Sequence, residues 1–396
     1  MPATSPWAGL WPLDPAVAYL NHGSFGACPT AILERQSELR ARLEREPVDF
    51  LVRALPGLLD EARAALASFV GADADDLVFV PNATAGVNAV VHSLPFGHGD
   101  EILTTDHAYA ACKKSLDYVG ARTGARVVVA EVPFPLGGEE DVVEPVLAAV
   151  TPRTRLAMLD HVTSPTALAF PIERLVAQLS ARGVDTLVDG AHALGMVPLD
   201  LERLSAAYYT SNAHKWLCAP KGAAFLHVRR DRQKGLHPSS ISHGYEPGSP
   251  EAHFKREFDW TGTTDPTAPL TIPFCLTYLG GLLPGGWPEL MGKNRKLALR
   301  AREIFLERFG GEPACPEGMV GSIASLVLPS PSLGSPAFGL SREAVGDWVR
   351  SRGVESWFHL VPSSASMLVR LSAQLYNDGS QYRRLAALLA EALGVG

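Results

Sequence analysis

Short apolar runs that alternate with helical patterns constrain the fold of this chain most strongly. Seven such runs lie between residues 75 and 230, at 77–80, 102–105, 126–130, 156–160, 186–189, 206–210 and 223–228. Between two of them, Ile172, Leu175, Val176 and Leu179 repeat at three- and four-residue spacing before Gly183, as in an amphipathic helix. Strands that alternate with helices predict an α/β fold, with a large domain built on a mostly parallel seven-stranded sheet flanked by helices.

The rest of the chain predicts a second, smaller unit. Residues 235–250 are rich in turn-forming residues and predict a long ordered loop. Amphipathic helices are expected at 32–46 and 58–70, before the sheet. Beyond about residue 266, a helical region leads to strand and helix patterns at 324–328, 342–351, 367–371 and 381–393. We therefore predict an N-terminal segment (1–17), a large domain (18–265) and a small C-terminal α/β domain (266–396).

Composition excludes several classes of protein. The net charge is −7 and no block of lysine and arginine stands out, which argues against nucleic acid as a partner. The five cysteines are odd in number and widely scattered, so we expect reduced thiols and neither a disulfide framework nor a metal site. The N-terminus has no signal-peptide pattern, and no apolar run approaches the ~18 residues of a membrane span. A cytoplasmic protein that does not bind membranes is expected.

Lys215 and Asp189 are the residues with the clearest chemistry. Lys215 follows one predicted strand within Ser-Asn-Ala-His-Lys-Trp (211–216), and Asp189 ends another. Ligands of such sheets bind at the carboxyl ends of strands. A lysine amine forms an imine with an aldehyde, and a carboxylate keeps a pyridine nitrogen protonated, which are the two contacts that pyridoxal phosphate (PLP) requires. An isolated aspartate here is more often a helix cap or an ion pair, and Lys221 is a rival amine whose Pro and Gly neighbours are typical of a surface turn.

Further polar residues follow other predicted strands. Ala83 and Thr84 begin a predicted helix, where backbone N–H groups form a phosphate site or where the residues simply cap the helix. His107 can stack on a pyridine ring and Tyr109 can transfer a proton, although a capped surface turn explains both equally well. His192 can hydrogen-bond the nearby carboxylate or a ring hydroxyl, and it can also be an ordinary loop histidine.

Several motifs together resemble a known family. They are Asp-Gly-Ala-His (189–192), Ser-Asn-Ala-His-Lys-Trp-Leu (211–217), Trp-Thr-Gly-Thr-Thr-Asp (260–265) and Arg-Leu-Ser-Ala-Gln-Leu-Tyr-Asn (370–377). This set resembles the class V aminotransferases, which are fold type I PLP enzymes. Tyr-Leu-Asn-His-Gly-Ser-Phe-Gly (19–26) and His-Val-Thr-Ser-Pro-Thr-Ala (161–167) are similar to isopenicillin N epimerase-like proteins. The likeness spans about residues 18–377.

The resemblance implies a role for each matching residue. Lys215 would be the Schiff-base lysine, Asp189 the partner of the pyridinium nitrogen and His107 the residue that stacks on the ring. The phosphate would be surrounded by Ala83, Thr84, Asn212 and His214, with Thr263 of a second subunit. Ser164 and His192 would lie near the ring hydroxyl, and the substrate would meet Asn21, His22 and Arg370. Arg370 would hold the α-carboxylate of an amino acid, because its guanidinium donates two parallel hydrogen bonds, while a structural ion pair explains an isolated arginine as well.

The resemblance also implies a homodimer with shared sites and a common first step. The substrate amine would displace Lys215 to form an external aldimine, and the freed lysine would remove the Cα proton. Epimerisation then needs a second acid, for which Tyr109 and His22 are candidates, whereas carbon-sulfur β-elimination and transamination are the alternatives. Residues 361–367 contain no cysteine, which argues against a persulfide route.

The sequence argues against two other classes of function. A PLP-binding module without turnover would be expected to lack the lysine or the arginine, and both are present. A nicotinamide dehydrogenase would need a G-x-G-x-x-G turn after its first strand, and the chain has none there. An epimerase-like PLP enzyme is therefore the leading hypothesis.

Overall fold

The predicted seven-stranded sheet forms the centre of the protein. The computed structural model describes residues 5–247, 253–362 and 364–395. The strands are β2 (Leu77–Val80), β3 (Glu101–Thr105), β4 (Arg126–Ala130), β5 (Thr154–Asp160), β6 (Asp185–Asp189), β7 (Tyr208–Asn212) and β8 (Ala224–Val228). Their order is β2-β8-β7-β6-β5-β3-β4, and only β8 runs antiparallel to its neighbours. The α/β fold class is confirmed.

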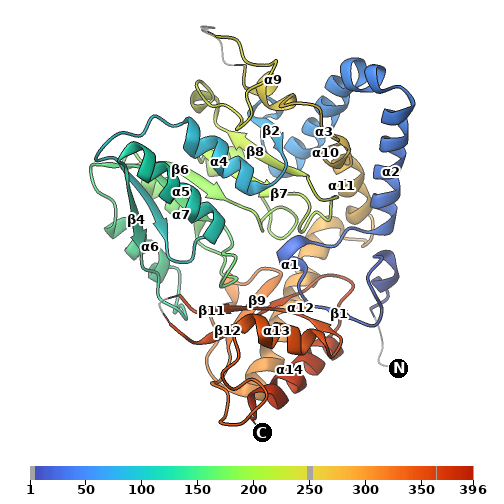
Figure 1. The fold of residues 1–396 in the computed structure, drawn as a ribbon, viewed down its shortest axis with the longest axis vertical. Coiled ribbons are helices and arrows are strands. Elements are labelled where there is room, and N and C mark those ends of the chain that lie inside the picture. Colours follow the sequence, from blue (N-terminus) through green and yellow to red (C-terminus); the bar gives the residue numbers. More distant parts are fainter. Residues whose placement is uncertain (1–4, 248–252, 363, 396) are drawn as a thin grey trace.

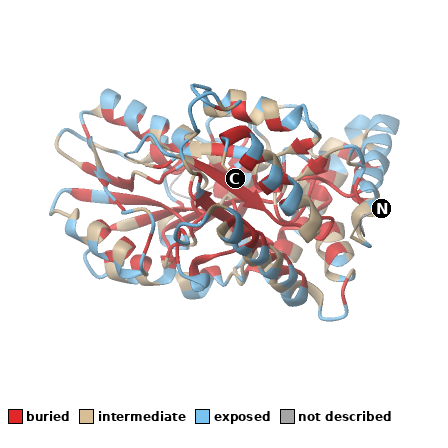
Figure 2. Ribbon diagram, turned by 90° about the horizontal axis from the view of Figure 1, so that it is seen from below, coloured by how far each residue is buried: buried red, intermediate tan, exposed pale blue. Residues whose placement is uncertain are grey.

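Helices cover both faces of this sheet (Figure 1). They include α4 (Ala83–Ser93), α5 (Ala110–Thr123), α6 (Glu140–Ala148), α7 (Ile172–Ser180) and the short α8 (Leu201–Leu204). The four apolar residues that predicted α7 are all buried, and the helix ends three residues before Gly183. Figure 2 shows the same division across the molecule, with buried strands inside and helices whose outer faces are exposed.

One predicted strand is shifted by two residues. The apolar pattern placed it at 206–210, whereas β7 runs from Tyr208 to Asn212. Pairing decides the register, because Tyr208 lies opposite Leu187 of β6 and Asn212 lies opposite Ala224 of β8. The consequence is functional: Asn212 becomes the last residue of the strand, and Lys215 follows it closely.

The first helices of the chain pack beside the sheet. They are α1 (His22–Phe25), α2 (Thr30–Arg45) and α3 (Leu55–Val70), and α10 (Thr267–Leu270) and α11 (Ile272–Gly280) contact the last two of them. The short helix α9 (Phe254–Asp259) contacts β2. The predicted loop at 235–250 carries neither helix nor strand over 235–247, and its last three residues lie outside the described residues.

The C-terminal unit contains a three-stranded antiparallel sheet, β11-β12-β9. Its elements are α12 (Gly286–Phe309), β9 (Ile323–Val327), α13 (Arg342–Arg350), β10 (Val354–Glu355), β11 (Trp357–Leu360), β12 (Met367–Ser372) and α14 (Gly379–Leu393). The N-terminal strand β1 (Ala18–Tyr19) pairs in parallel with β10. Residues 18–19 therefore share a sheet with β10 of the C-terminal unit, and the domain boundaries stay predictions.

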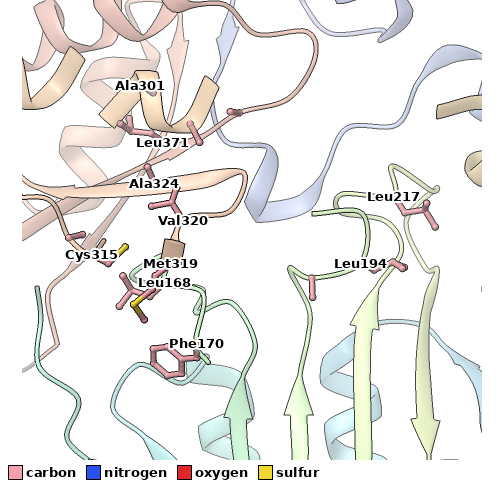
Figure 3. Packing of buried hydrophobic residues seen from close by; sticks show 14 of the residues in the cluster. Leu168, Phe170, Leu194, Leu217, Ala301, Cys315, Met319, Val320, Ala324 and Leu371 are labelled. Carbon is pink, nitrogen blue, oxygen red and sulfur yellow. The ribbon is translucent and has the colours of Figure 1, made fainter. Parts of the chain in front are cut away.

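A single apolar core joins the two units. Figure 3 shows Leu168 and Phe170 of the large unit close to Met319 and Val320, with Leu371 beside Ala301 further on. Two backbone hydrogen bonds reinforce this junction, from Ala169 N to Met319 O (2.9 Å) and from Leu136 N to Ala314 O (2.9 Å). The two units are thus in direct contact through buried side chains, which matters because the site draws residues from both.

We predict that Leu168→Ala lowers the free energy of unfolding by about 2–5 kcal/mol, because a buried leucine is lost from this junction and a cavity remains. Urea denaturation followed by circular dichroism measures the change. Leu333→Ala is the control, since that leucine is 87% exposed and its removal should cost no more than about 0.5 kcal/mol. Equal effects of the two substitutions would show that the junction does not contribute as described.

Candidate active site

A cavity of about 610 Å³ lies at the carboxyl ends of β5, β6 and β7. Most of the predicted site residues line it. They are Ala83, Thr84, Tyr109, Ser164, Asp189, His192, Asn212, His214 and Lys215. Parallel pairing explains this convergence, because strands that run in the same direction end at the same edge of the sheet.

Lys215 is a buried amine with an unusual proton affinity. Burial lowers its pKa from 10.5 to about 7, and the positive charge of Arg370 acts in the same direction. Asp189 opposes the shift by attraction. Its Nζ lies 3.1 Å from His192 Nε2. An amine with such a pKa is in large part free of its extra proton at neutral pH and mostly free of it above, and the free amine is the form that attacks an aldehyde.

The C-terminal end of α1 packs closely against the backbone of His214 and Lys215. Gly26 has a φ of +69°, and a Cβ on it would lie 2.0 Å from the carbonyl oxygen of His214 and 3.0 Å from the Cα of Lys215. Only glycine satisfies both the left-handed conformation and the lack of space. The glycine of the Asn-His-Gly-Ser-Phe-Gly motif therefore fixes the position of Lys215.

Asp189 has a partner carboxyl that the sequence analysis did not identify. Asp160 ends β5, lies opposite Asp189 in the parallel register and lines the cavity. Burial and the neighbouring Asp189 hold the pKa of Asp160 well above its usual range, and its Oδ2 has no hydrogen-bond partner among the described residues. Asp189 accepts from Ala191 N (3.0 Å) and from the Cys112 thiol (3.2 Å).

These contacts assign the charges of the pair. Burial raises the pKa of Asp189 too, but donation from Ala191 N and from the Cys112 thiol favours its anion. Two adjacent buried carboxyls do not both ionise readily. Asp160 is therefore the neutral member and Asp189 the anionic one. The sequence contained a sign of this residue, because Asp160, like Asp189, ends an apolar run.

The N-terminus of α4 lies at the cavity, where a phosphate is predicted to bind. Asn82 caps the helix by accepting from Ala85 N (2.8 Å), and Asn212 Oδ1 accepts from Ala83 N (2.8 Å). The helix approaches β7 closely at Gly86, where a Cβ would lie 2.3 Å from Thr210 Oγ1. Helix N-termini attract anions because their N–H groups point outward.

His214 lies beside this helix end and is neutral in the described structure. Its Nδ1 is 3.0 Å from Ala223 O, so the ring donates to that carbonyl. Burial lowers its pKa to about 4. Donation from Nε2 to a phosphate thus requires a second proton, which the negative charge of a phosphate favours.

Arg370 of β12 reaches the cavity wall from the C-terminal unit. It does not line the cavity itself but donates to Ser164 O (2.8 Å) and to Ser24 Oγ (2.6 Å), whose residues do. It also donates to Asn21 Oδ1 (3.2 Å) and to Ser164 Oγ (3.4 Å), and its Nε has no partner among the described residues. A buried guanidinium with neutral partners is a strong site for a carboxylate.

Three predicted residues do not take the expected place. His107 lies outside the cavity lining, and its ring nitrogens contact Thr166 Oγ1 (2.7 Å) and Val132 O (3.0 Å). His22 is held by Tyr376 Oη (2.9 Å) and by Lys215 O (3.0 Å). Burial lowers the pKa of His22 to about 3, so its ring is neutral at neutral pH and is a weak acid. Thr263 is exposed and outside this cavity, and its predicted role belongs to a partner subunit.

The ring-stacking role of His107 stays a prediction, and its neighbour is the second candidate. Tyr109 is the aromatic residue of that segment that lines the cavity. The strand ends at Thr105, and the turn that follows buries His107 against Phe134 and Phe170 while it leaves Tyr109 at the start of α5. Sequence alone does not decide which of two aromatic rings in a turn faces inward.

Comparison with known proteins agrees with this geometry. Residues 33–251 match the family Aminotransferase class-V. The chain belongs to this family. An isopenicillin N epimerase from Amycolatopsis lactamdurans is 37% identical, over 96% of each chain. A putative L-cysteine desulfhydrase from Oryza sativa subsp. japonica is 33% identical, over 80% of this chain and 68% of that protein.

The fold is also that of solved structures. A mutant of the C-S lyase C-DES, solved with glycine covalently linked to its PLP cofactor, superposes with a TM-score of 0.81 at 21% identity, over 95% of this chain and 97% of that one. The site brings together an amine, a carboxylate, a helix N-terminus and a buried guanidinium. These groups fit pyridoxal phosphate, and Lys215 for the aldehyde, Asp189 for the ring nitrogen and the α4 end for the phosphate remain the predicted contacts.

Other kinds of site are not found in the described part of the chain. Across residues 5–247, 253–362 and 364–395, no cluster of histidine, cysteine, aspartate or glutamate is arranged to hold a metal ion. Within those same residues no helix is both long and apolar enough to cross a membrane.

We predict that Asp160→Asn leaves the affinity for PLP within about threefold of the original, because an amide replaces a neutral carboxyl of the same shape. Asp189→Asn removes the anion and should weaken binding on the order of tenfold or more. Absorbance titration of the cofactor-free protein with PLP measures both. A stronger effect at Asp160 than at Asp189 would reverse the assignment of charge.

Proposed function

We propose that this enzyme uses PLP to remove the Cα proton of an amino acid and to return a proton on the opposite face, as an epimerase or racemase. The observation that carries the proposal is a cavity shared by a free amine, Lys215, and a protonated phenol, Tyr109. When bound, PLP supplies the aldehyde that links to the substrate and the ring that withdraws electrons from Cα.

Binding of the substrate is assigned to Arg370 and its neighbours. The guanidinium is directed to the wall of the cavity by Ser24 and Ser164. A substrate α-carboxylate would replace these neutral partners with a charged one, which strengthens each hydrogen bond. This contact would fix the Cα within reach of Lys215, whose amine accepts the proton.

Tyr109 is proposed as the second acid. Burial, followed by the charges of Cys112 and Asp189, raises the pKa of its phenol, so it carries its proton at neutral pH. In the sheet, β7 precedes Lys215 and β3 precedes Tyr109, while Asp189 and Asp160 end the two strands between them. The amine and the phenol thus follow strands on either side of the carboxyl pair, and the proposal requires that they reach opposite faces of the Cα.

Carbon-sulfur β-elimination is the second candidate. It is supported by the desulfhydrase relative, whose identity of 33% is close to that of the epimerase. The two reactions share removal of the Cα proton by Lys215 and differ in what happens next. Elimination needs a substrate with a leaving group on Cβ, such as L-cysteine, whereas epimerisation acts on substrates such as isopenicillin N.

We also propose a cytoplasmic homodimer. All five cysteines are buried free thiols, which suits a reducing compartment. Phe25 lines the cavity although 65% of its surface is exposed, and Thr263 is exposed as well. A partner subunit that covers this face would bring its own Thr263 to the phosphate end, as the resemblance implied.

We predict that Tyr109→Phe reduces inversion at least about 100-fold while Cα proton exchange continues, because general acid catalysis contributes about 10²–10⁴-fold and Lys215 is untouched. The holoenzyme is incubated with L- and D-amino acids, isopenicillin N and L-cysteine in deuterated water. Deuterium at Cα, chirality, keto acid and released sulfide are measured.

Tyr118→Phe is the matched control, since this tyrosine belongs to the same helix but is 57% exposed, and it should leave all rates unchanged. Inversion at the original rate in Tyr109→Phe would remove Tyr109 from the proposed role. Sulfide and keto acid without inversion in the original enzyme would favour the second candidate.

A further inference from the structure

Lys215, His192 and Trp216 form a buried chain of nitrogen atoms. The Lys215 Nζ is 3.1 Å from His192 Nε2, and the Trp216 indole N–H donates to His192 Nδ1 at 3.4 Å. His192 and Trp216 are almost fully buried. Each nitrogen of the His192 imidazole thus contacts a different partner, Nε2 the Lys215 amine and Nδ1 the Trp216 indole N–H.

The indole fixes the proton on the imidazole. An indole N–H is a donor only, so Nδ1 of His192 must accept and carries no proton. A histidine whose Nδ1 is free of hydrogen carries its proton on Nε2, because the hydrogen bond at one nitrogen decides the tautomer at the other. The Nε2–H group is therefore directed at Lys215 Nζ.

The lysine must then accept this hydrogen bond. An ammonium group has three donors and no acceptor, so it cannot receive the Nε2–H, whereas a free amine offers its lone pair. A protonated Lys215 would place two N–H donors against each other. The contact thus selects the neutral amine by a specific interaction, in addition to general burial.

Other charged groups around Lys215 act independently of this chain. Arg370 disfavours the ammonium, while Asp189, Cys112 and Asp160 favour it. His22 contacts the lysine only through the backbone carbonyl and lies against the Trp216 ring, with centroids 4.8 Å apart. None of these residues distinguishes between the two tautomers of His192. Trp216 does so, through a single N–H group.

We propose that Trp216 is a positioning residue that holds His192 as the Nε2–H tautomer, so that His192 donates to the Lys215 amine and keeps it ready for attack. The use of Lys215 by PLP rests on the proposed function, but the tautomer does not. With the cofactor bound, the same Nε2–H remains a fixed donor toward whichever acceptor lies beside it.

Nitrogen-15 NMR of the full-length protein, labelled at histidine, tests the tautomer directly. Spectra are recorded with and without bound PLP and assigned with His192→Gln. We expect the Nε2 of His192 to have the shift of a protonated nitrogen and Nδ1 that of an unprotonated one. The opposite pattern, or a charged ring, would overturn the proposal even if the enzyme is fully active.

Trp216→Phe tests the consequence for the lysine. Without the indole N–H, His192 can take the other tautomer and accept from an ammonium, so the protonated form of Lys215 gains a partner. The pH midpoint for capture of PLP by the cofactor-free protein, followed by absorbance, should rise by about one unit, which means about fivefold slower capture at pH 7. An unchanged midpoint in a folded variant would contradict the proposal.

Trp11→Phe is the matched control. Trp11 is also buried, but its N–H donates to Ala27 O at 3.1 Å and not to a histidine. This variant should lose stability without moving the midpoint, and an equal rise in it would mean that loosened packing is the cause. If Trp216→Phe does not fold, the tautomer of the original protein decides the question. A failure of the proposed function would appear differently, as PLP that does not bind at Lys215 although the Nε2–H tautomer is present.

Discussion

The parallel alignment of β5, β6 and β7 is the constraint on which the site depends. Because the three strands run in one direction and in register, their last residues emerge at one edge, and Asp160, Asp189 and Asn212 meet there. Lys215 follows Asn212 closely, so its amine is brought beside the carboxyls without any long loop. The same alignment places the N-terminus of α4 at this edge, since that helix follows β2 and packs on β7 through Gly86.

Burial then gives these groups their chemistry. A lysine, a histidine, two aspartates and an arginine are kept away from water, and each responds by a shift of its pKa toward the neutral form. Specific hydrogen bonds modify this general trend: donors to Asp189 preserve an anion, and neutral oxygens around Arg370 leave its charge available. The core shared by the two units is what allows Arg370, which comes from β12, to reach the same place.

Much of this could be predicted from the sequence. Strand ends are local features, so the apolar runs predicted the sheet, and residues such as Asp189, His192 and Lys215 could be placed in one cavity. Facts that depend on side-chain direction were not accessible. The sequence did not decide whether His107 or Tyr109 faces the cavity, and it did not show that burial lowers the pKa of His22. Asp160 was not identified because its proximity to Asp189 depends on the pairing of β5 with β6, which the sequence does not show.

The central claim is that Lys215 is the amine that binds the cofactor. Borohydride reduction of the PLP-loaded protein attaches the cofactor permanently to the lysine that holds it, and peptide mass spectrometry identifies that residue. We expect a single modified peptide, and we expect it to contain Lys215. Modification at Lys221, the other lysine of the cavity lining, or at any lysine elsewhere in the chain would contradict it.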